Sequence, residues 1–159
     1  MRDLYDQDFH AWALAQAAAL RRAAELRINL PDVDLAHLAE EIEDMGSEQA
    51  HAVESALARI IEHLLKLEYS PSPWPRRGWK ASVAKHRAHL ARRLRASPSL
   101  KTPARAEEML CNAWQDGRRL AVIGLEAYSE AAAAIPQDCP YSFEQLCDFD
   151  WLPPSRLTL

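Results

Sequence analysis

The longest uninterrupted helical pattern in the chain runs from Asp34 to Tyr69, and it limits the fold more than any other feature. This stretch contains no proline, and its apolar residues recur at steps of three and four, the spacing of one face of an α-helix. They are Leu35, Leu38, Ile42 and Met45, followed by Val53, Leu57, Ile60, Leu64 and Leu67. A helix of this length spans roughly 50 Å, so we expect the rest of the chain to pack around it.

Gly46 and Ser47 separate the two sets of apolar residues. Both are weak helix formers, so a bend or a break at Gly46 is one alternative. The step from residue 42 to residue 53 is eleven residues, close to a whole number of helical turns, so one helix can also carry both sets. We favour a continuous helix with a more exposed first half and an enclosed second half, where Ile61 and Leu65 widen the apolar face.

The composition indicates an all-α protein. The chain has 159 residues and only four glycines, and the alternating β-branched and aromatic patterns of strands are scarce. A chain of this length can bury a core without a disulfide or metal staple. We therefore predict an all-α fold, a bundle of four long helices plus a short C-terminal helix, with residues 1–159 forming a single helical domain.

Three long helices and one short helix are predicted in addition to the central one. They cover residues 6–27, 78–96, 103–131 and 142–147. Asp6 and Thr102 are the expected caps of the first and the fourth long helix, and Ser142 with Gln145 has the capping-box spacing. The fourth long helix carries mostly small residues at alternating steps of four and three, which lets a neighbouring helix approach closely. These are Ala106, Leu110, Ala113, Gly117, Leu120, Gly124, Ala127 and Ala131. The aromatic and apolar residues expected to fasten the tail to the bundle are Phe149, Trp151 and Leu152.

Charge and cysteine content exclude several classes of protein. The net charge of -4 argues against a globally basic nucleic-acid binder. Cys111, Cys139 and Cys147 form no CxxC pair, which disfavours a disulfide framework or a cysteine zinc site. The N-terminal segment lacks the apolar core of a signal peptide, and Arg21 and Arg22 interrupt the alanine-rich run that follows. We expect a cytoplasmic protein with no membrane segment.

The predicted helix 78–96 is strongly basic. Between Tyr69 and Glu107 the chain has no acidic residue. Its apolar stripe consists of Trp79, Val83, His86, Leu90 and Leu94, and the other faces carry Lys80, Lys85, Arg87, Arg92, Arg93 and Arg95. Clustered Lys and Arg are typical of phosphate contacts, so nucleic-acid contact through Arg76, Arg77, Arg92 and Arg93 is one hypothesis. The alternative is that Arg92, Arg93 and Arg95 are satisfied internally by Glu48 and Glu54 of the central helix.

Five segments of the sequence together resemble the bacterial domain-of-unknown-function family twenty-nine. They are residues 4–9, 38–46, 63–66, 97–100 and 139–146, and they occur in the family's order over nearly the whole chain. The string Glu40-Glu41-Ile42-Glu43-Asp44-Met45-Gly46 is the most specific of them. The resemblance implies a helical fold and a bacterial cytosolic setting. The family has no assigned activity, so the resemblance assigns no catalytic residue.

A polar stripe on the central helix provides a second functional hypothesis. His37, Glu41, Asp44 and Glu48 lie at i, i+4, i+7 and i+11, on one edge of the apolar face. Carboxylates and imidazole in this arrangement can hold a divalent metal, which would suit a metal-dependent hydrolase. The string also resembles the Glu-rich motif of all-helical nucleotide pyrophosphohydrolases. The second motif of those enzymes, a Glu three residues before an Asp on another helix, is missing, because the residue three positions before Asp116 is Ala113.

A solvated acidic face near a helix N-terminus explains the same stripe without a ligand. A metal site that joins His63 or His86 to Glu41 would require the helices that carry these residues to place them at the same level of the bundle. We therefore favour no cofactor, and the chain is not expected to be an enzyme. The preferred interpretation is a non-catalytic module for protein interaction or homo-oligomerisation, with an interaction surface formed by Glu40, Glu41, Glu43 and Asp44.

Overall fold

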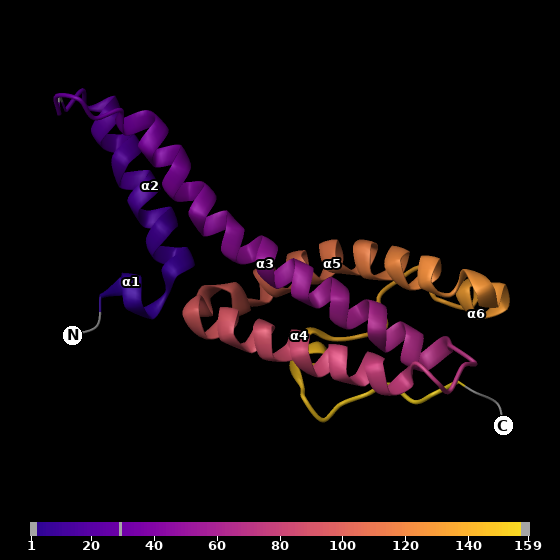
Figure 1. Ribbon diagram of the computed structural model, residues 1–159. Helices are drawn as coiled ribbons and strands as arrows, with labels where there is room; N and C mark the ends of the chain where they lie inside the picture. The colour runs from indigo at the N-terminus through magenta and orange to yellow at the C-terminus, as the bar shows by residue number, and fades with distance from the viewer. Residues whose placement is uncertain (1–2, 29, 157–159) are drawn as a thin grey trace.

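The computed structural model describes residues 3–28 and 30–156, which contain helices and loops but no strand. The long helices are α2 (Phe9–Glu25), α3 (Leu35–Tyr69), α4 (Arg76–Ala96) and α5 (Pro103–Gly124). The short elements are α1 (Leu4–Gln7), η1 (Pro98–Lys101), η2 (Glu126–Tyr128), α6 (Ser129–Ala133) and α7 (Phe143–Cys147). Figure 1 shows the arrangement, which confirms the predicted all-α fold with four long helices and a short C-terminal one.

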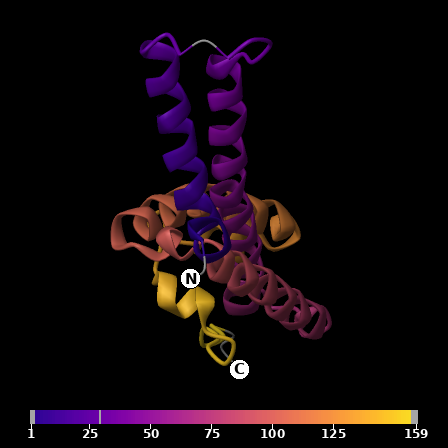
Figure 2. The ribbon, with the colours of Figure 1, turned by 90° about the vertical axis from the view of Figure 1, so that its left-hand side faces the viewer.

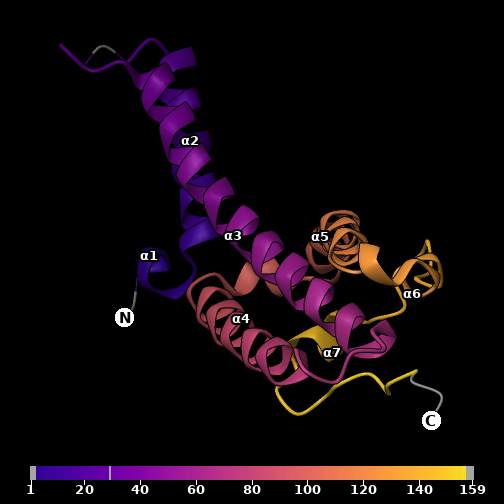
Figure 3. The same cartoon turned by 45° about the vertical axis from the view of Figure 1, so that its right-hand side comes forward.

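The central helix α3 is continuous across Gly46, as predicted. Asp34 caps its N-terminus by accepting a hydrogen bond from the backbone N–H of His37. The proline-rich segment after Ser70 ends it, because proline lacks a backbone donor and fixes its own φ. The second half of α3 packs against both α4 and α5, and its first half packs against α2 (Figure 3). Most of the hydrophobic core therefore surrounds the second half.

The helix α2 and the first half of α3 form a two-helix arm that projects from the bundle (Figure 2). Small residues line their contact: Ala13, Ala17 and Ala39 are fully buried, and a Cβ atom on Gly46 would lie 3.0 Å from that of Ala13. The expected stripe was partly wrong here, since Leu38 and Met45 are 41% and 47% exposed. Close packing of two helices places the smallest side chains between them and turns larger ones outward.

The start of α2 differs from the prediction, because Asp8 and not Asp6 is the cap. The Asp8 carboxylate accepts a hydrogen bond from the Ala11 N–H and two more from the backbone N–H and hydroxyl of Ser99, at 2.6 and 2.9 Å. Buried His10 extends this link, since its Nδ1 lies 2.9 Å from the carbonyl oxygen of Gly46. These contacts fix the base of the arm to η1 and α3.

Arg87 was expected on the exposed side of α4, but it is only 1% exposed. Its guanidinium donates hydrogen bonds to the carbonyl oxygens of Gln145, Leu146 and Trp151 at 3.0, 3.0 and 2.8 Å. The last carbonyls of a helix lack partners within the helix, so Arg87 supplies donors for the end of α7. Of the three residues expected to fasten the tail, Trp151 packs against the core, while Phe149 and Leu152 remain exposed.

Glu68 holds the tail at a second point. This buried carboxylate accepts hydrogen bonds from the Tyr141 hydroxyl and from Nε of Arg156, both at 2.7 Å. Arg156 also stacks over the ring of Tyr69, 5.1 Å from its centroid. The predicted capping box of Ser142 and Gln145 is present at the start of α7. The C-terminal segment thus closes one flank of the bundle between α4 and α5.

The helix α5 begins at Pro103 as predicted, but the Thr102 side chain makes no capping hydrogen bond, and the helix ends at Gly124. Ala106, Ala113 and Gly117 of the predicted small-residue seam are buried, whereas Gly124 is exposed. In residues 3–28 and 30–156, no helix is both long and apolar enough to cross a membrane.

Candidate functional site

A cleft of about 680 Å³ opens between α3, α4 and α5. We call it the central cleft. It is lined by Ala52, Ser55, Ala56, Ala58, Arg59, His86, His89, Arg93, Asp116, Arg119 and Leu120. Consecutive residues of a helix point about 100° apart, so His86 faces the cleft while buried Arg87 faces the C-terminal tail. The cleft therefore lies on the flank of the bundle away from the C-terminal tail.

Three helices supply the polar side chains of the central cleft. Ser55 and Arg59 are one turn apart on α3 and form its floor. His86, His89 and Arg93 come from successive turns of α4 on one side, and Asp116 and Arg119 come from α5 on the other. Because α4 and α5 both pack against α3, residues that are far apart in the sequence surround one cavity.

The charge of the central cleft is positive, since three arginines face one aspartate. Two of the arginines have protein partners. Arg59 Nη1 lies 2.9 Å from Glu62 Oε2, and Arg93 Nη1 donates to the Gln49 side-chain oxygen at 3.0 Å. Arg119 and Asp116 have no hydrogen-bond or ion-pair partner in the described part of the chain. The Arg119 guanidinium therefore presents all its donors to solvent or to a ligand.

The two histidines of α4 lie side by side in the cleft, with ring centroids 6.3 Å apart. Burial lowers the pKa of His86, and the nearby positive charges of His63, Lys85, His89 and Arg59 lower it further. His86 is therefore mainly neutral at pH 7 in the unliganded protein.

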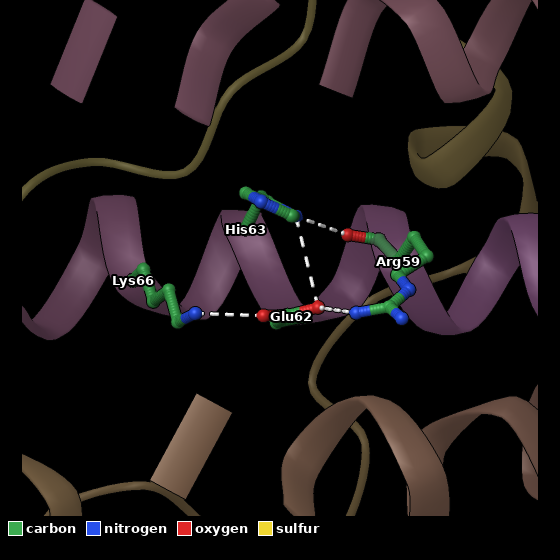
Figure 4. Close-up of polar contacts among 4 residues, drawn as sticks. All are labelled: Arg59, Glu62, His63 and Lys66. Atoms are coloured by element: carbon green, nitrogen blue, oxygen red, sulfur yellow. Dashed lines mark hydrogen bonds and ion pairs between the residues drawn. The ribbon is translucent and has the colours of Figure 1, made fainter. Parts of the chain in front are cut away.

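Glu62 anchors a charged network on α3 next to the cleft (Figure 4). It accepts hydrogen bonds from Lys66 Nζ at 2.6 Å and from Arg59 Nη1 at 2.9 Å. His63 Nδ1 lies 2.8 Å from the carbonyl oxygen of Arg59. This network fixes the Arg59 side chain along the helix and keeps the buried carboxylate paired.

The structure places the predicted metal stripe on the outer surface of the arm. His37, Glu41, Asp44 and Glu48 are all exposed. His37 Nδ1 binds the Asp34 carboxylate at 2.6 Å, and this contact holds the pKa of His37 above its usual value. In residues 3–28 and 30–156, no group of three or more His, Cys, Asp and Glu side chains has the arrangement of a metal site. His63 lies roughly 33 Å from Glu41 along α3, and His86 lies on α4, which packs against the second half of α3.

The predicted acidic interaction surface also lies on the arm. Glu40, Glu41 and Asp44 are exposed, while Glu43 forms an ion pair with Arg21 of α2. That hydrogen bond lowers the pKa of Glu43. The surface is thus acidic, but one of its four carboxylates stabilises the arm.

The four arginines of the phosphate-contact hypothesis do not form one patch. Arg76 and Arg77 lie in the first turn of α4, and Arg92 and Arg93 in its last turns, roughly 24 Å away along the axis. Arg93 faces the central cleft, and Arg92 is exposed outside it. The expected pairing with Glu48 and Glu54 was wrong, because in the described residues Arg93 binds Gln49 and Glu54 binds Asn112.

Comparison with known proteins assigns the family. Residues 4–152 match the family described as a domain of unknown function, DUF29. The chain belongs to this family. The crystal structure of an α-helical protein of unknown function from Rhodospirillum rubrum is similar to this DUF29 chain, with a TM-score of 0.78 and 25% sequence identity. The match covers 95% of this chain and 93% of that one. No curated protein matches the sequence.

Several important residues of this DUF29 protein were missed in the sequence. Arg59 and Arg119 lie on different helices, far apart in the sequence, so their convergence on one cleft has no sequence signature. Arg87 and Glu68 are charged residues buried by the tail. A signal did exist for Arg87: it lies four residues after Val83 and three before Leu90, on the apolar stripe itself.

Glu62 gives the DUF29 chain a testable pH dependence. Burial raises the pKa of Glu62, but hydrogen bonds from Lys66 and Arg59 outweigh it, so its pKa lies below the usual 4.5. Such a group stabilises the fold above its unfolded pKa, and this stabilisation is lost as pH falls through the lowered folded pKa. We expect Glu62→Gln to lower the free energy of unfolding at neutral pH, measured by urea denaturation, and the deficit to shrink below about pH 4.5. Glu107→Gln, an exposed control, should show neither effect. A deficit that stays constant down to about pH 3 would contradict this account.

Proposed function

We propose that this protein is a non-catalytic interaction module that self-associates through its α2–α3 arm. One observation carries the proposal: large apolar side chains are exposed along the arm, from the loop at its tip to Met45 near its base. They are Leu26, Ile28, Leu30, Val33, Leu38 and Met45, between 41% and 75% exposed. Single exposed apolar residues are common, but several large ones on one short arm indicate an interaction surface.

The arm is built as half of a helical bundle. Among the described residues, the projecting part of each of the two helices packs mainly against the other (Figure 2). A second copy that packed its own arm there would complete a four-helix bundle, the common way for paired amphipathic helices to bury their remaining faces. A two-fold dimer uses the same patch on both chains, so that patch must be self-complementary.

The charges on the arm support a second copy of the chain as the occupant. Arg22 of α2 and Arg27 just after it are exposed with one acid between them, Glu25, whereas α3 exposes Glu40, Glu41 and Asp44. In a two-fold pair of arms, the basic side of one chain can face the acidic side of the other. Like-signed surfaces would instead repel and favour a different partner.

The bacterial and cytoplasmic setting expected from the sequence is part of the same proposal. The cytoplasmic part is supported by the cysteines, since Cys111, Cys139 and Cys147 are free thiols in the structure. Unpaired cysteines are typical of proteins that work in a reducing compartment.

Light scattering coupled to size-exclusion chromatography tests the self-association. We expect the wild type to shift from monomer to dimer as its concentration rises from micromolar to submillimolar. The double variant Leu38→Glu and Met45→Glu should remain a monomer, because each dimer would bury four added carboxylates at its interface.

Ile123→Glu is the matched control. Ile123 is 54% exposed on α5, outside the arm, so this variant should dimerise like the wild type. A wild-type chain that is monomeric at every concentration would contradict the proposal, and so would arm variants that dimerise normally.

A further inference from the structure

The central cleft has the size and chemistry of a ligand site, on a different part of the molecule from the arm. Its volume of about 680 Å³ falls within the usual range for small-molecule pockets. Its lining combines small apolar residues with charged groups from three helices. Three arginines in one cavity repel each other, and an anion among them relieves that repulsion.

We propose that the central cleft binds a small phosphorylated molecule whose phosphate group is held by Arg59, Arg93 and Arg119. Guanidinium groups donate paired hydrogen bonds that match the oxygen atoms of a phosphate. The body of the ligand lies against Ala52 and Ala56 of α3 and against Leu120 of α5. Ser55 and Asp116 accept hydrogen bonds from its hydroxyl groups.

The cleft suits a small phosphorylated molecule better than a nucleic acid. A nucleic acid requires a basic track that follows many phosphates, whereas the next arginines on α4, Arg76 and Arg77, lie at the far end of that helix. Asp116 would also repel a continuous phosphate backbone. A simple carboxylate has one negative charge, so it would neutralise less of the cluster than a phosphate dianion.

The proposal also predicts a proton linkage. The charged groups that act on His86 are Arg59 and His63 of α3 and Lys85 and His89 of α4. The other charged groups that line the same cleft are Arg93 of α4 and Asp116 and Arg119 of α5. A bound dianion offsets the positive charges that lower the pKa of His86. Binding therefore raises this pKa, and affinity should increase as pH falls through neutrality. Sulfate isolates this effect, because its own charge stays constant between about pH 5 and 8.

The test measures binding of inorganic phosphate and sulfate to the full chain by calorimetry and by thermal melting, against chloride at equal ionic strength. We expect both dianions to bind and to raise the melting temperature. Arg119→Gln should weaken binding about tenfold or more, as loss of a charge-assisted hydrogen bond requires. The residue is exposed and unpaired among the described residues, so the variant should fold normally.

Arg92→Gln is the matched control, since it removes the same charge from an exposed position of α4 outside the cleft. It should change the affinity less than about twofold. His86→Gln should retain sulfate binding but lose most of its pH dependence. Three results would overturn the proposal: equal weakening by Arg92→Gln and Arg119→Gln, equal binding of acetate and phosphate, or binding of oligothymidylate without binding of either dianion.

Discussion

Replacing Arg87 with methionine is expected to destabilise the protein by about 3 kcal/mol, more than any exposed substitution. Methionine retains much of the apolar stem but removes the donors that reach the carbonyl oxygens of Gln145, Leu146 and Trp151. These buried acceptors would then lack partners, and the end of α7 would lose its cap. For a chain of this size the melting temperature should fall by roughly 6–12 °C.

The same variant should release the C-terminal segment before the rest of the bundle unfolds. Hydrogen exchange should show lost protection in residues 143–156 with little change in α2. Arg92→Met, an exposed control on the same helix, should change stability by less than about 0.5 kcal/mol. Equal stability of the two variants, or loss of protection spread evenly over the chain, would contradict the role assigned to Arg87.

Gly117→Val is expected to cost about 3 kcal/mol by forcing α5 away from α3. A Cβ atom at residue 117 would lie 2.7 Å from the carbonyl oxygen of Ala58 and 2.8 Å from the side chain of Ile61. The oxygen belongs to helix backbone and cannot rotate away, so the two helices must separate. Gly117→Ala should have a smaller effect in the same direction, despite the better helix propensity of alanine.

Gly78→Ala is the control for this substitution. Gly78 is exposed in the first turn of α4, and no atom of another element lies within 4 Å of the position its Cβ atom would take. Alanine there should stabilise the protein by about 0.5–1 kcal/mol, because it restricts the unfolded chain and favours helix. Urea denaturation of the three variants tests the contrast. A Gly117→Val protein as stable as the wild type would show that the α3–α5 contact is not tight.

The arm shows how far the periodicity of a sequence can be taken. The spacing of apolar residues predicted one continuous α3 with a less enclosed first half, and both features are present. The same spacing predicted that Leu38 and Met45 lie in the helix–helix contact of this first half, because they are the larger apolar residues of that segment. The neighbour α2 packs instead on Ala39 and Gly46, because it is rich in alanine and approaches closely. A pattern identifies an apolar face but does not reveal the shape of the surface that meets it.

The amino-acid sequence alone determined the all-α fold, the extent of α3, the capping box of α7 and the family to which the chain belongs. These properties depend on local preferences, on spacing along one helix and on the order of short motifs. The tertiary structure decided the roles of the charged residues. Arg87 is buried because the tail crosses α4 there, and Arg59, Arg93 and Arg119 converge because two helices pack beside α3. The energy of a charge depends on its surroundings in space, and contacts between distant segments supply those surroundings.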